Sequence, residues 1–304
     1  AIHFLETDST VSVIGERFQV SFTKGTGYLS EYIFNNRQII KSDLIPHFWR
    51  APLDNDLGNL MHTRTASWKN VDKELTLEYF QRSLANNVAK VKVITEHNTT
   101  GSRITMTYRI YGNGLINIQQ QLKTGNKRLP ELPRFGMKMT LPKDFNRLTW
   151  FGRGPHESYW DRKTSAAVKV FSGSVWDQTY PYVRPQETGN KTDVRWMALD
   201  NGTIGLLAIG QPTFDGSVHN YPYSDLDYVP AGRLHGKLDL KPKNQVDWLI
   251  DYRQTGVGGD NSWGARPHLK YTLAGNSISY EYHFFLKPFV KDDDLMTLSK
   301  LKIK

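Results

Sequence analysis

Two pairs of closely spaced carboxylates are the residues whose types and spacing first suggest chemistry. The stretch RAPLDNDLG places Asp54 and Asp56 two positions apart, and GPHESYWDR places Glu157 and Asp161 four apart. Two carboxyl groups about 5 to 9.5 Å apart can serve as the acid and the base or nucleophile that cleave a glycosidic bond. Neither spacing is specific, because the first pair also fits a polar turn or helix cap and the second can bond to backbone or to nearby arginines.

The stretch GVGGDNSWG (residues 256–264) sets one tryptophan among four glycines. It is neither a phosphate loop, because the closing Lys-Ser/Thr is missing, nor a dinucleotide fingerprint, because no helical pattern follows. One interpretation is a turn that places Trp263 in the core. The other is a ligand loop, in which the glycines let the backbone approach a sugar, Trp263 covers its C–H face, and Asp260 and Asn261 bind hydroxyl groups.

Other kinds of catalytic centre have little support in the sequence. The nine histidines are dispersed without an H-E-x-x-H pair, and the chain has no cysteine and no G-x-S-x-G elbow. We therefore expect no metal bound by this segment, no thiolate nucleophile and no serine triad.

Composition predicts a folded, soluble protein. Hydrophobic residues make up 38% of the 304 residues, and no run approaches the roughly 20 apolar residues of a membrane span. The net charge is +9, but the basic residues are scattered along strand-like segments such as VAKVKV, so we expect no nucleic-acid partner. No export signal is recognisable, and because the absence of cysteine does not define a compartment, the location stays open between the cytoplasm and the periplasm. Since the first methionine is Met61, we expect a segment of a longer protein.

Period-two alternation of apolar and polar residues dominates the chain. Examples are RFQVSF (17–22), SRITMTYRIYGNGLINIQQQL (102–122) with a hairpin turn at its Gly-Asn-Gly, and NSISYEYHFFL (276–286). Many short strands without regularly interposed helices favour an all-β antiparallel sandwich or barrel. The expected fold is a large two-sheet sandwich.

Helical segments are expected at only a few places. The candidates are residues 61–68, SYWDRKTSA (158–166) and DDLMTLSKL (293–301). Because no repeat, low-complexity tract or Pro/Ser linker interrupts the chain, we expect residues 1–304 to form a single domain.

Four motifs in a fixed order carry a family resemblance. They are FWRAPLDNDLG (48–58), WFGRGPHESYWDRKTSA (150–166), YPYVRPQETGNKTDVRW (180–196) and GVGGDNSWG (256–264). Together they resemble the C-terminal domain of the large β-galactosidases of glycoside hydrolase family 2, called the β-galactosidase small-chain domain. The motifs span some two hundred residues, which makes the match specific.

The resemblance implies a supersandwich of two large antiparallel sheets related to galactose mutarotases. It also implies that two catalytic glutamates perform retaining hydrolysis of β-galactosides in a (β/α)₈ barrel that precedes this domain. On this resemblance, the domain packs on the barrel of the same chain and Trp263 contributes to the galactoside pocket, with no catalytic residue in this segment. The Mg²⁺ and Na⁺ ions of such enzymes would be held mainly by other domains, and the full enzyme could be a homo-oligomer.

The same match suggests places for other residues. Arg50, Asp54 and Asn55 belong to a family motif that we expect near the junction with the barrel. Glu187 and Arg195 match positions in a loop that we expect near the opening of the active site. Their roles are hypotheses that the resemblance alone does not define.

Two alternative functions stay open at this point. The first is a free-standing mutarotase, in which a histidine and a glutamate interconvert sugar anomers, with His156 beside Glu157, or His219, as candidates. Adjacent residues on an extended strand point to opposite faces, which argues against the pair. The second alternative is a carbohydrate-binding or assembly module without a catalytic contribution.

Overall fold

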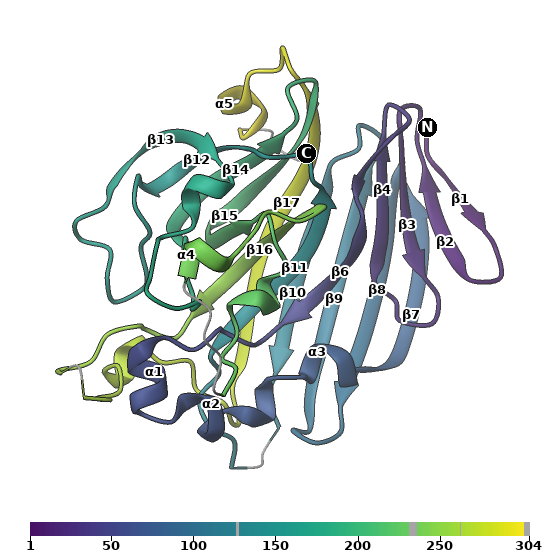
Figure 1. Cartoon of the computed structure of the whole chain (residues 1–304). Helices are drawn as coiled ribbons and strands as arrows, with labels where there is room; N and C mark the ends of the chain where they lie inside the picture. Colours follow the sequence, from purple (N-terminus) through teal and green to yellow (C-terminus); the bar gives the residue numbers. More distant parts are fainter. Residues whose placement is uncertain (126–127, 231–235, 262, 301–304) are drawn as a thin grey trace.

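Antiparallel strands, many of them with one buried face, are the main elements of this computed structural model, which describes residues 1–125, 128–230, 236–261 and 263–300 (Figure 1). The predicted alternation is confirmed: Phe18, Val20 and Phe22 are buried on one strand, and Tyr282 and Phe284 on another. The strands are β1 (His3–Glu6), β2 (Thr10–Ile14), β3 (Phe18–Thr23), β4 (Leu29–Phe34), β5 (Arg37–Ile40), β6 (Ser42–His47), β7 (Thr76–Ala85), β8 (Val88–His97), β9 (Ser102–Tyr111), β10 (Ile116–Lys123), β11 (Arg134–Pro142), β12 (Arg147–Gly154), β13 (Ala167–Ser174), β14 (Lys191–Asp200), β15 (Ile204–His219), β16 (Gln245–Gln254) and β17 (Ser279–Val290).

The strand pairings among these elements are antiparallel. One layer runs from β1 through β4 to β6, which pairs with β11 and then β16. The other runs from β7 through β10 to β17. The long strand β15 pairs with both β16 and β17, so it joins the two layers into a nearly barrel-like network.

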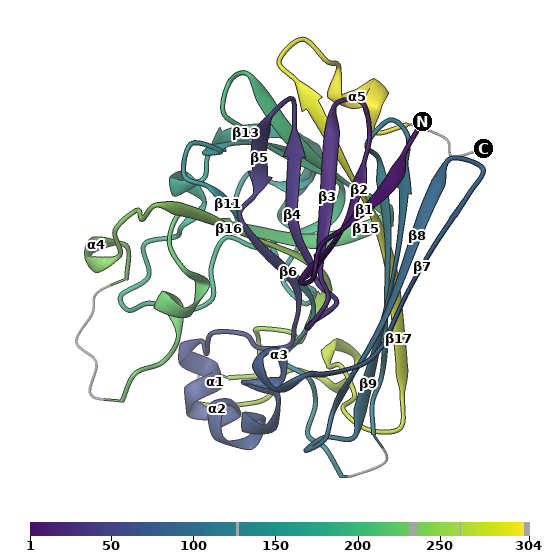
Figure 2. The same ribbon diagram turned by 90° about the vertical axis from the view of Figure 1, so that its right-hand side faces the viewer.

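The main core fills the space between the two layers, which face each other in Figure 2. The ring centroids of Phe22 on β3 and Tyr108 on β9 lie 5.0 Å apart in an edge-to-face contact across this space. Such pairs add to the stability that comes from removing both rings from water. The expected all-β two-sheet architecture is confirmed.

Short helices connect strands, and α1, α2 and α3 gather at one end of the sandwich, whereas α5 lies at the opposite end (Figure 1). The helical prediction for residues 61–68 is confirmed by α2 and a following 3₁₀ turn. A prediction near the C-terminus is confirmed in a shorter form, because α5 begins after the N-cap Asp294 and Leu301 lies outside the described residues. The helices are α1 (Asp54–Gly58), α2 (Met61–Arg64), α3 (Val71–Glu74), α4 (Gly236–Asp239) and α5 (Leu295–Leu298), and the 3₁₀ turns are η1 (Ala66–Trp68), η2 (Trp176–Gln178), η3 (Tyr223–Leu226) and η4 (Leu269–Tyr271).

The prediction of a helix over residues 158–166 is wrong. Tyr159 and Arg162 exchange both backbone hydrogen bonds at 2.9 Å, which closes a tight reversal. The polar side chains of this segment bond to other loops, so they do not form the solvent face of a helix.

No helix in the described parts of the chain is long and apolar enough to cross a membrane.

Candidate functional site

The four sequence motifs meet around one open groove at the end of the sandwich that carries α1. Its volume is about 440 Å³. Polar side chains, an aromatic ring and glycine backbone share the lining, which suits a ligand with many hydroxyl groups. The lining residues are Leu53, Asp54 and Asn55 of the first motif, Arg162 of the second, Tyr182 and Gln186 of the third, and Val257, Gly258, Gly259 and Asn261 of the fourth.

Asp161 holds the backbone of the glycine-rich loop, residues 256–264, in place. Its carboxylate accepts hydrogen bonds from the backbone N–H of Val257 at 3.0 Å and of Gly258 at 2.7 Å. A carboxylate that bridges two adjacent amides restrains a segment whose glycines would otherwise leave it free to move. The prediction that Asp161 bonds to backbone is therefore confirmed.

Arg50 holds the start of the same loop in place. Its guanidinium donates to the carbonyl oxygens of Thr255 and of Gly256, the latter at 3.1 Å. Asp56 holds the guanidinium in place through two bonds of 2.7 and 2.8 Å, and it also accepts from Leu53 N–H at the start of α1. Both side chains are buried, so they form a structural pair that joins α1 to the loop. The interpretation of Asp56 as a helix cap is confirmed.

Trp263 is not part of the core, because 89% of its surface is exposed. Its neighbour Gly264 lies against the end of α1: a Cβ atom on Gly264 would come within 2.5 Å of the Gly58 carbonyl. The positive φ of 95° at Gly264 also favours glycine. The backbone beside Trp263 is thus held against α1 while the indole projects into solvent.

The other two residues predicted to bind ligand lie in the same loop with different surroundings. Asn261 lines the groove, and its Oδ1 accepts from Trp263 N–H at 2.9 Å. Asp260 is exposed and pairs with Nε2 of His268 at 2.7 Å. Asn261 therefore faces the groove directly, whereas Asp260 engages the segment that follows the loop.

The wall opposite the glycine-rich loop is formed by residues 182–186. Asp54 pairs with the guanidinium of Arg184 and accepts from Gln186 Nε2 at 3.2 Å. Asn55 lies beside Asp54 on α1 and also lines the groove. Asp54 is the one carboxylate among the described lining residues, so the groove does not supply the two carboxyl groups that glycoside hydrolysis requires.

Glu157 supports this wall from behind. Its carboxylate accepts from Arg162 Nη2 at 2.5 Å, from Gly189 N–H at 2.8 Å, from Thr188 Oγ1 at 3.1 Å and from the hydroxyl of Tyr182. Burial and then the Glu157 carboxylate raise the pKa of Tyr182 to about 12, so its hydroxyl stays protonated near neutral pH. The sequence left open whether Glu157 and Asp161 are catalytic or bond to backbone and nearby arginines. The second possibility is confirmed for Glu157, which bonds to Arg162 and to backbone.

Glu187, which we expected in a loop near the opening of the active site, has a side chain that lies in the core. It is 0% exposed and accepts from Arg134 Nη2 at 3.0 Å, from Gln254 Nε2 at 3.3 Å and from the hydroxyl of Tyr223. Arg134 also pairs with Asp251 at 3.2 Å. A side chain enclosed in this way cannot touch a ligand in the groove, so Glu187 anchors the loop to the sheet.

Arg195, the other residue expected near the opening, does not line the groove. It lies on β14, donates to the Asp193 carbonyl at 2.6 Å and stacks over the Phe151 ring at 5.5 Å. A cation above an aromatic ring commonly stabilises a sheet surface.

The histidines of the mutarotase alternative do not converge with a carboxylate. His156 is exposed and bonds to Ser165 Oγ at 3.1 Å, while the adjacent Glu157 points into the loop network. His219 is completely buried, and burial followed by the charge of Arg134 lowers its pKa to about 3. A histidine with so low a pKa is a weak proton carrier near neutral pH.

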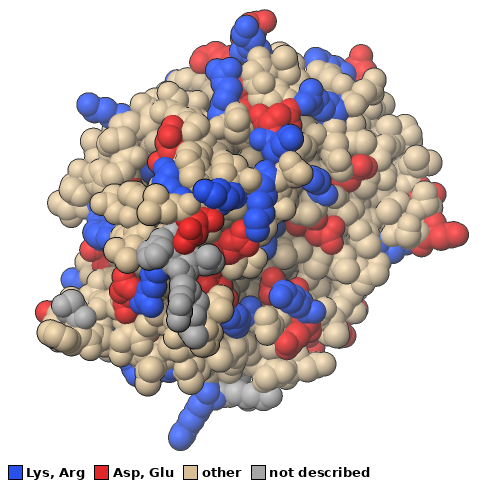
Figure 3. All heavy atoms as spheres, in the orientation of Figure 1, with Lys and Arg blue, Asp and Glu red and all other residues tan. Residues whose placement is uncertain are grey.

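Charge on the molecular surface is mixed. On the face shown in Figure 3, Lys and Arg side chains are interspersed with Asp and Glu, without a continuous basic stripe of the kind that tracks nucleic acid. Among the described residues, no three His, Cys, Asp or Glu side chains gather as a metal site requires.

The family model described as "Beta galactosidase small chain" matches residues 14–286. The chain belongs to the β-galactosidase small-chain family. It is 37% identical over 284 residues to a β-galactosidase of Priestia megaterium and 30% identical over 281 residues to one of Halalkalibacterium halodurans. These matches cover 93% and 90% of this chain but 27% of each relative, so the small-chain segment spans about a quarter of the relatives' length.

Solved structures agree with the fold of this small-chain family member. A galactose 1-epimerase from Lactobacillus acidophilus superposes with a TM-score of 0.51 at 7% identity, covering 95% of this chain and 99% of the epimerase. A TPR-domain containing protein from Parabacteroides distasonis superposes with a TM-score of 0.55 at 10% identity, covering 97% of this chain and 49% of that one. At such low identity the likeness concerns the fold alone, and it confirms the mutarotase-like architecture.

Several residues of the groove were not singled out from the sequence. Tyr182 and Gln186, and Arg184 that pairs with Asp54 of the groove, stand in the third motif, where their position in YPYVRPQE was the available signal. Arg134, the buried partner of Glu187, and Asp251, which also pairs with Arg134, lie on separate strands outside the motifs and carry no local signal of their own.

Proposed function

We propose that this chain is the accessory domain of a retaining β-galactosidase that hydrolyses terminal β-D-galactosides. In this role it packs on the catalytic barrel of the same protein and contributes Trp263 to the galactoside pocket. Asn261 and Asp260 assist at the same loop, and the metal ions stay with other domains. The single observation that carries the proposal is the exposure of Trp263, which stands two residues after Asn261 of the groove where all four family motifs meet.

The exposed indole of Trp263 leaves a large apolar surface in contact with water, which is unfavourable in free energy. Exposed apolar surface of this size gains free energy when a ligand or a protein covers it. Asp161 and Arg50 hold the backbone of residues 255–258, and Gly264 lies against the end of α1, so the loop is held on both sides of Trp263 and loses less conformational freedom on binding. A sugar with an apolar C–H face and a polar rim matches this arrangement.

The absence of a second carboxylate among the groove's described lining residues fits an accessory role. We expect the purified segment, shown to be folded by circular dichroism, not to hydrolyse o-nitrophenyl galactoside. The full-length protein is expected to do so and to lose the activity when residues 1–304 are deleted. Turnover by the segment that disappears on mutation of Asp54 would contradict the proposal.

The mutarotase alternative is tested with the same preparation. Freshly dissolved α-galactose is added and the optical rotation is followed. We expect the rate in buffer, because His219 is buried and His156 does not meet a carboxylate. Acceleration over buffer would support a free-standing mutarotase.

A further inference from the structure

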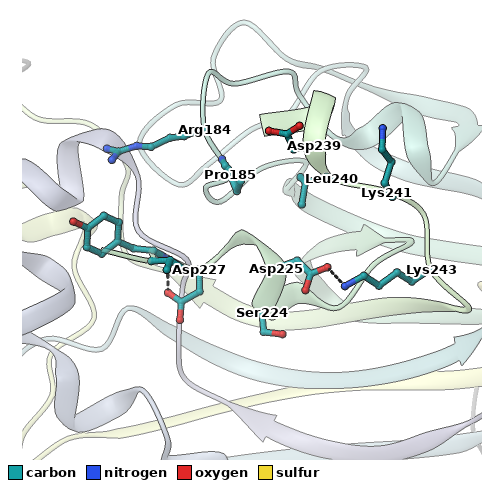
Figure 4. A pocket seen from close by; sticks show the side chains of 11 residues that line it. Arg184, Pro185, Ser224, Asp225, Asp227, Asp239, Leu240, Lys241 and Lys243 are labelled. Atoms are coloured by element: carbon teal, nitrogen blue, oxygen red, sulfur yellow. Dashed lines mark hydrogen bonds and ion pairs between the residues drawn. The ribbon is translucent and has the colours of Figure 1, made fainter. Parts of the chain in front are cut away.

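A second cavity of about 430 Å³ lies directly behind the loop that walls the groove. Figure 4 shows Pro185 of this loop and Leu240, which follows α4, both lining the cavity, with Ser224 and Asp225 of η3 on another side. Val229, which is 62% exposed, completes the lining together with Tyr228. The cavity therefore combines apolar walls with a polar rim, the composition typical of small-molecule sites.

The charges around this cavity cancel. Lys243 pairs with Asp225 at 2.6 Å, and Lys69 pairs with Asp227 at 2.6 Å. A lining without net charge, rich in donors and acceptors, favours a neutral ligand with many hydroxyl groups over a phosphate or a free cation. Among the described lining residues, the charged ones are three aspartates (Asp225, Asp227 and Asp239) and three basic residues (Arg184, Lys241 and Lys243), so the formal sum of these six is zero.

The walls are fixed by contacts to the body of the domain. The Asp227 carboxylate accepts from Trp49 Nε1 at 3.2 Å. At the start of α4, a Cβ atom on Gly236 would come within 1.7 Å of the Tyr182 carbonyl oxygen, so α4 lies closely against the loop. The cavity is therefore a built feature of the described residues, with walls that a ligand would meet already in position.

One short loop separates the cavity from the groove. Tyr182 and Gln186 line the groove, whereas Arg184 and Pro185 line the cavity. Arg184 connects the two spaces, because its guanidinium pairs with Asp54 at the rim of the groove. The groove and the cavity are therefore neighbours in the chain, with residues 182–186 contributing to both linings.

We propose that this cavity is a second saccharide subsite, which binds a neutral sugar unit of an extended β-galactoside whose terminal unit lies at the groove. The proposal rests on the function proposed above and names the substrate class: oligosaccharides of three or more units, in preference to small galactosides. It assigns a specificity role to Tyr228 and Val229, which form the apolar wall of the cavity.

The test compares two substrates in the full-length protein. Val229→Trp fills the cavity and Tyr228→Ala removes part of its wall, while Val170→Trp on β13 is a matched control, because Val170 is 49% exposed and lies outside the cavity lining. For a β-linked galactotriose, both cavity variants are expected to raise KM about three- to tenfold, the size of a lost stacking or packing contact. For o-nitrophenyl galactoside, kcat/KM is expected to stay within about twofold, as it should for the control with both substrates.

Equal losses for both substrates, or no loss for either, would overturn the subsite. Equal losses accompanied by a lower melting temperature would show instead that the cavity is covered by another part of the protein. If the unaltered protein hydrolyses neither substrate, the function proposed above fails. The subsite is then decided by titrating galactotriose into the protein, with binding that Val229→Trp weakens as the supporting result and unchanged binding as the opposing one.

Discussion

Single carboxylates in this domain hold backbone and arginine side chains in place. Asp56 and Asp161 anchor α1 and the glycine-rich loop, and Glu157 supports the opposite wall of the groove. Their hydrogen bonds are charge-assisted and several are buried, so they contribute more to order than exposed pairs do. From the sequence alone, these three carboxylates could have had a catalytic or a structural role. Their contacts favour the structural role.

Replacing Glu187 by Ala tests the buried anchor. The change leaves Arg134 with one of its two carboxylate partners, and we expect a loss of about 3 to 5 kcal/mol in the free energy of unfolding. The measurement is denaturant unfolding of the domain. Asp54→Ala is the comparison, because its exposed pair with Arg184 should cost about 0 to 1 kcal/mol. Similar losses for both variants would contradict the assignment of Glu187 to the core.

His219 predicts a specific dependence of stability on pH. Its folded pKa of about 3 lies below its usual 6.5, so the unfolded chain takes up the proton first and wild-type stability falls as pH drops from about 6.5 toward 3. The slope from this residue approaches about 1.4 kcal/mol per pH unit. Asp215 acts in the opposite direction, because burial raises its pKa to about 7.

The difference in unfolding free energy between wild type and His219→Gln removes the Asp215 contribution, which both proteins share. As the pH is lowered from 6.5 to 4, the unfolding free energy of wild type should fall relative to that of the variant. A difference that is constant with pH would show that His219 takes up its proton equally in both states.

At the scale of elements, the site depends on loops that are locked to one another. Asp161 of the second motif and Arg50 of the first both bond to the fourth, and Gly58 at the end of α1 contacts Gly264. The strands were predictable, because the side-chain alternation of a half-buried strand is local. The reversal at residues 158–166 was not, because Asp161 and Ser158 bond to Val257 and Thr192, which are distant in sequence.

Gly264→Ala tests the contact between the loop and α1. The new methyl group would meet the Gly58 carbonyl within 2.5 Å at a positive φ, so we expect a loss of about 1 to 3 kcal/mol or a displaced loop. Gly25→Ala is the matched control, because nothing lies within 4 Å of its Cβ position. The measurement is the melting temperature of the two variants, which should be lower for Gly264→Ala than for Gly25→Ala. Equal melting temperatures would argue against the contact between the loop and α1.

At the scale of the whole molecule, a two-layer sandwich supports a polar groove and, beside it, a second cavity. The order of the four motifs in the sequence was enough to predict the family and the fold. The groove could be anticipated from the glycine-rich loop, whereas the second cavity could not. Its walls come from residues 184–185, 224–229 and 239–243, which carry no shared pattern and meet only in the folded chain.

The central claim is that Trp263 serves a binding site and not the stability of this domain. The most direct measurement is kcat/KM for o-nitrophenyl galactoside in the full-length protein, with Trp263→Ala compared with Leu269→Ala, an equally exposed apolar side chain at 89%. We predict that both variants keep the wild-type melting temperature, and that only Trp263→Ala loses about 0.5 to 3 kcal/mol of transition-state stabilisation. An unchanged kcat/KM for Trp263→Ala, or an equal loss for Leu269→Ala, would contradict the claim.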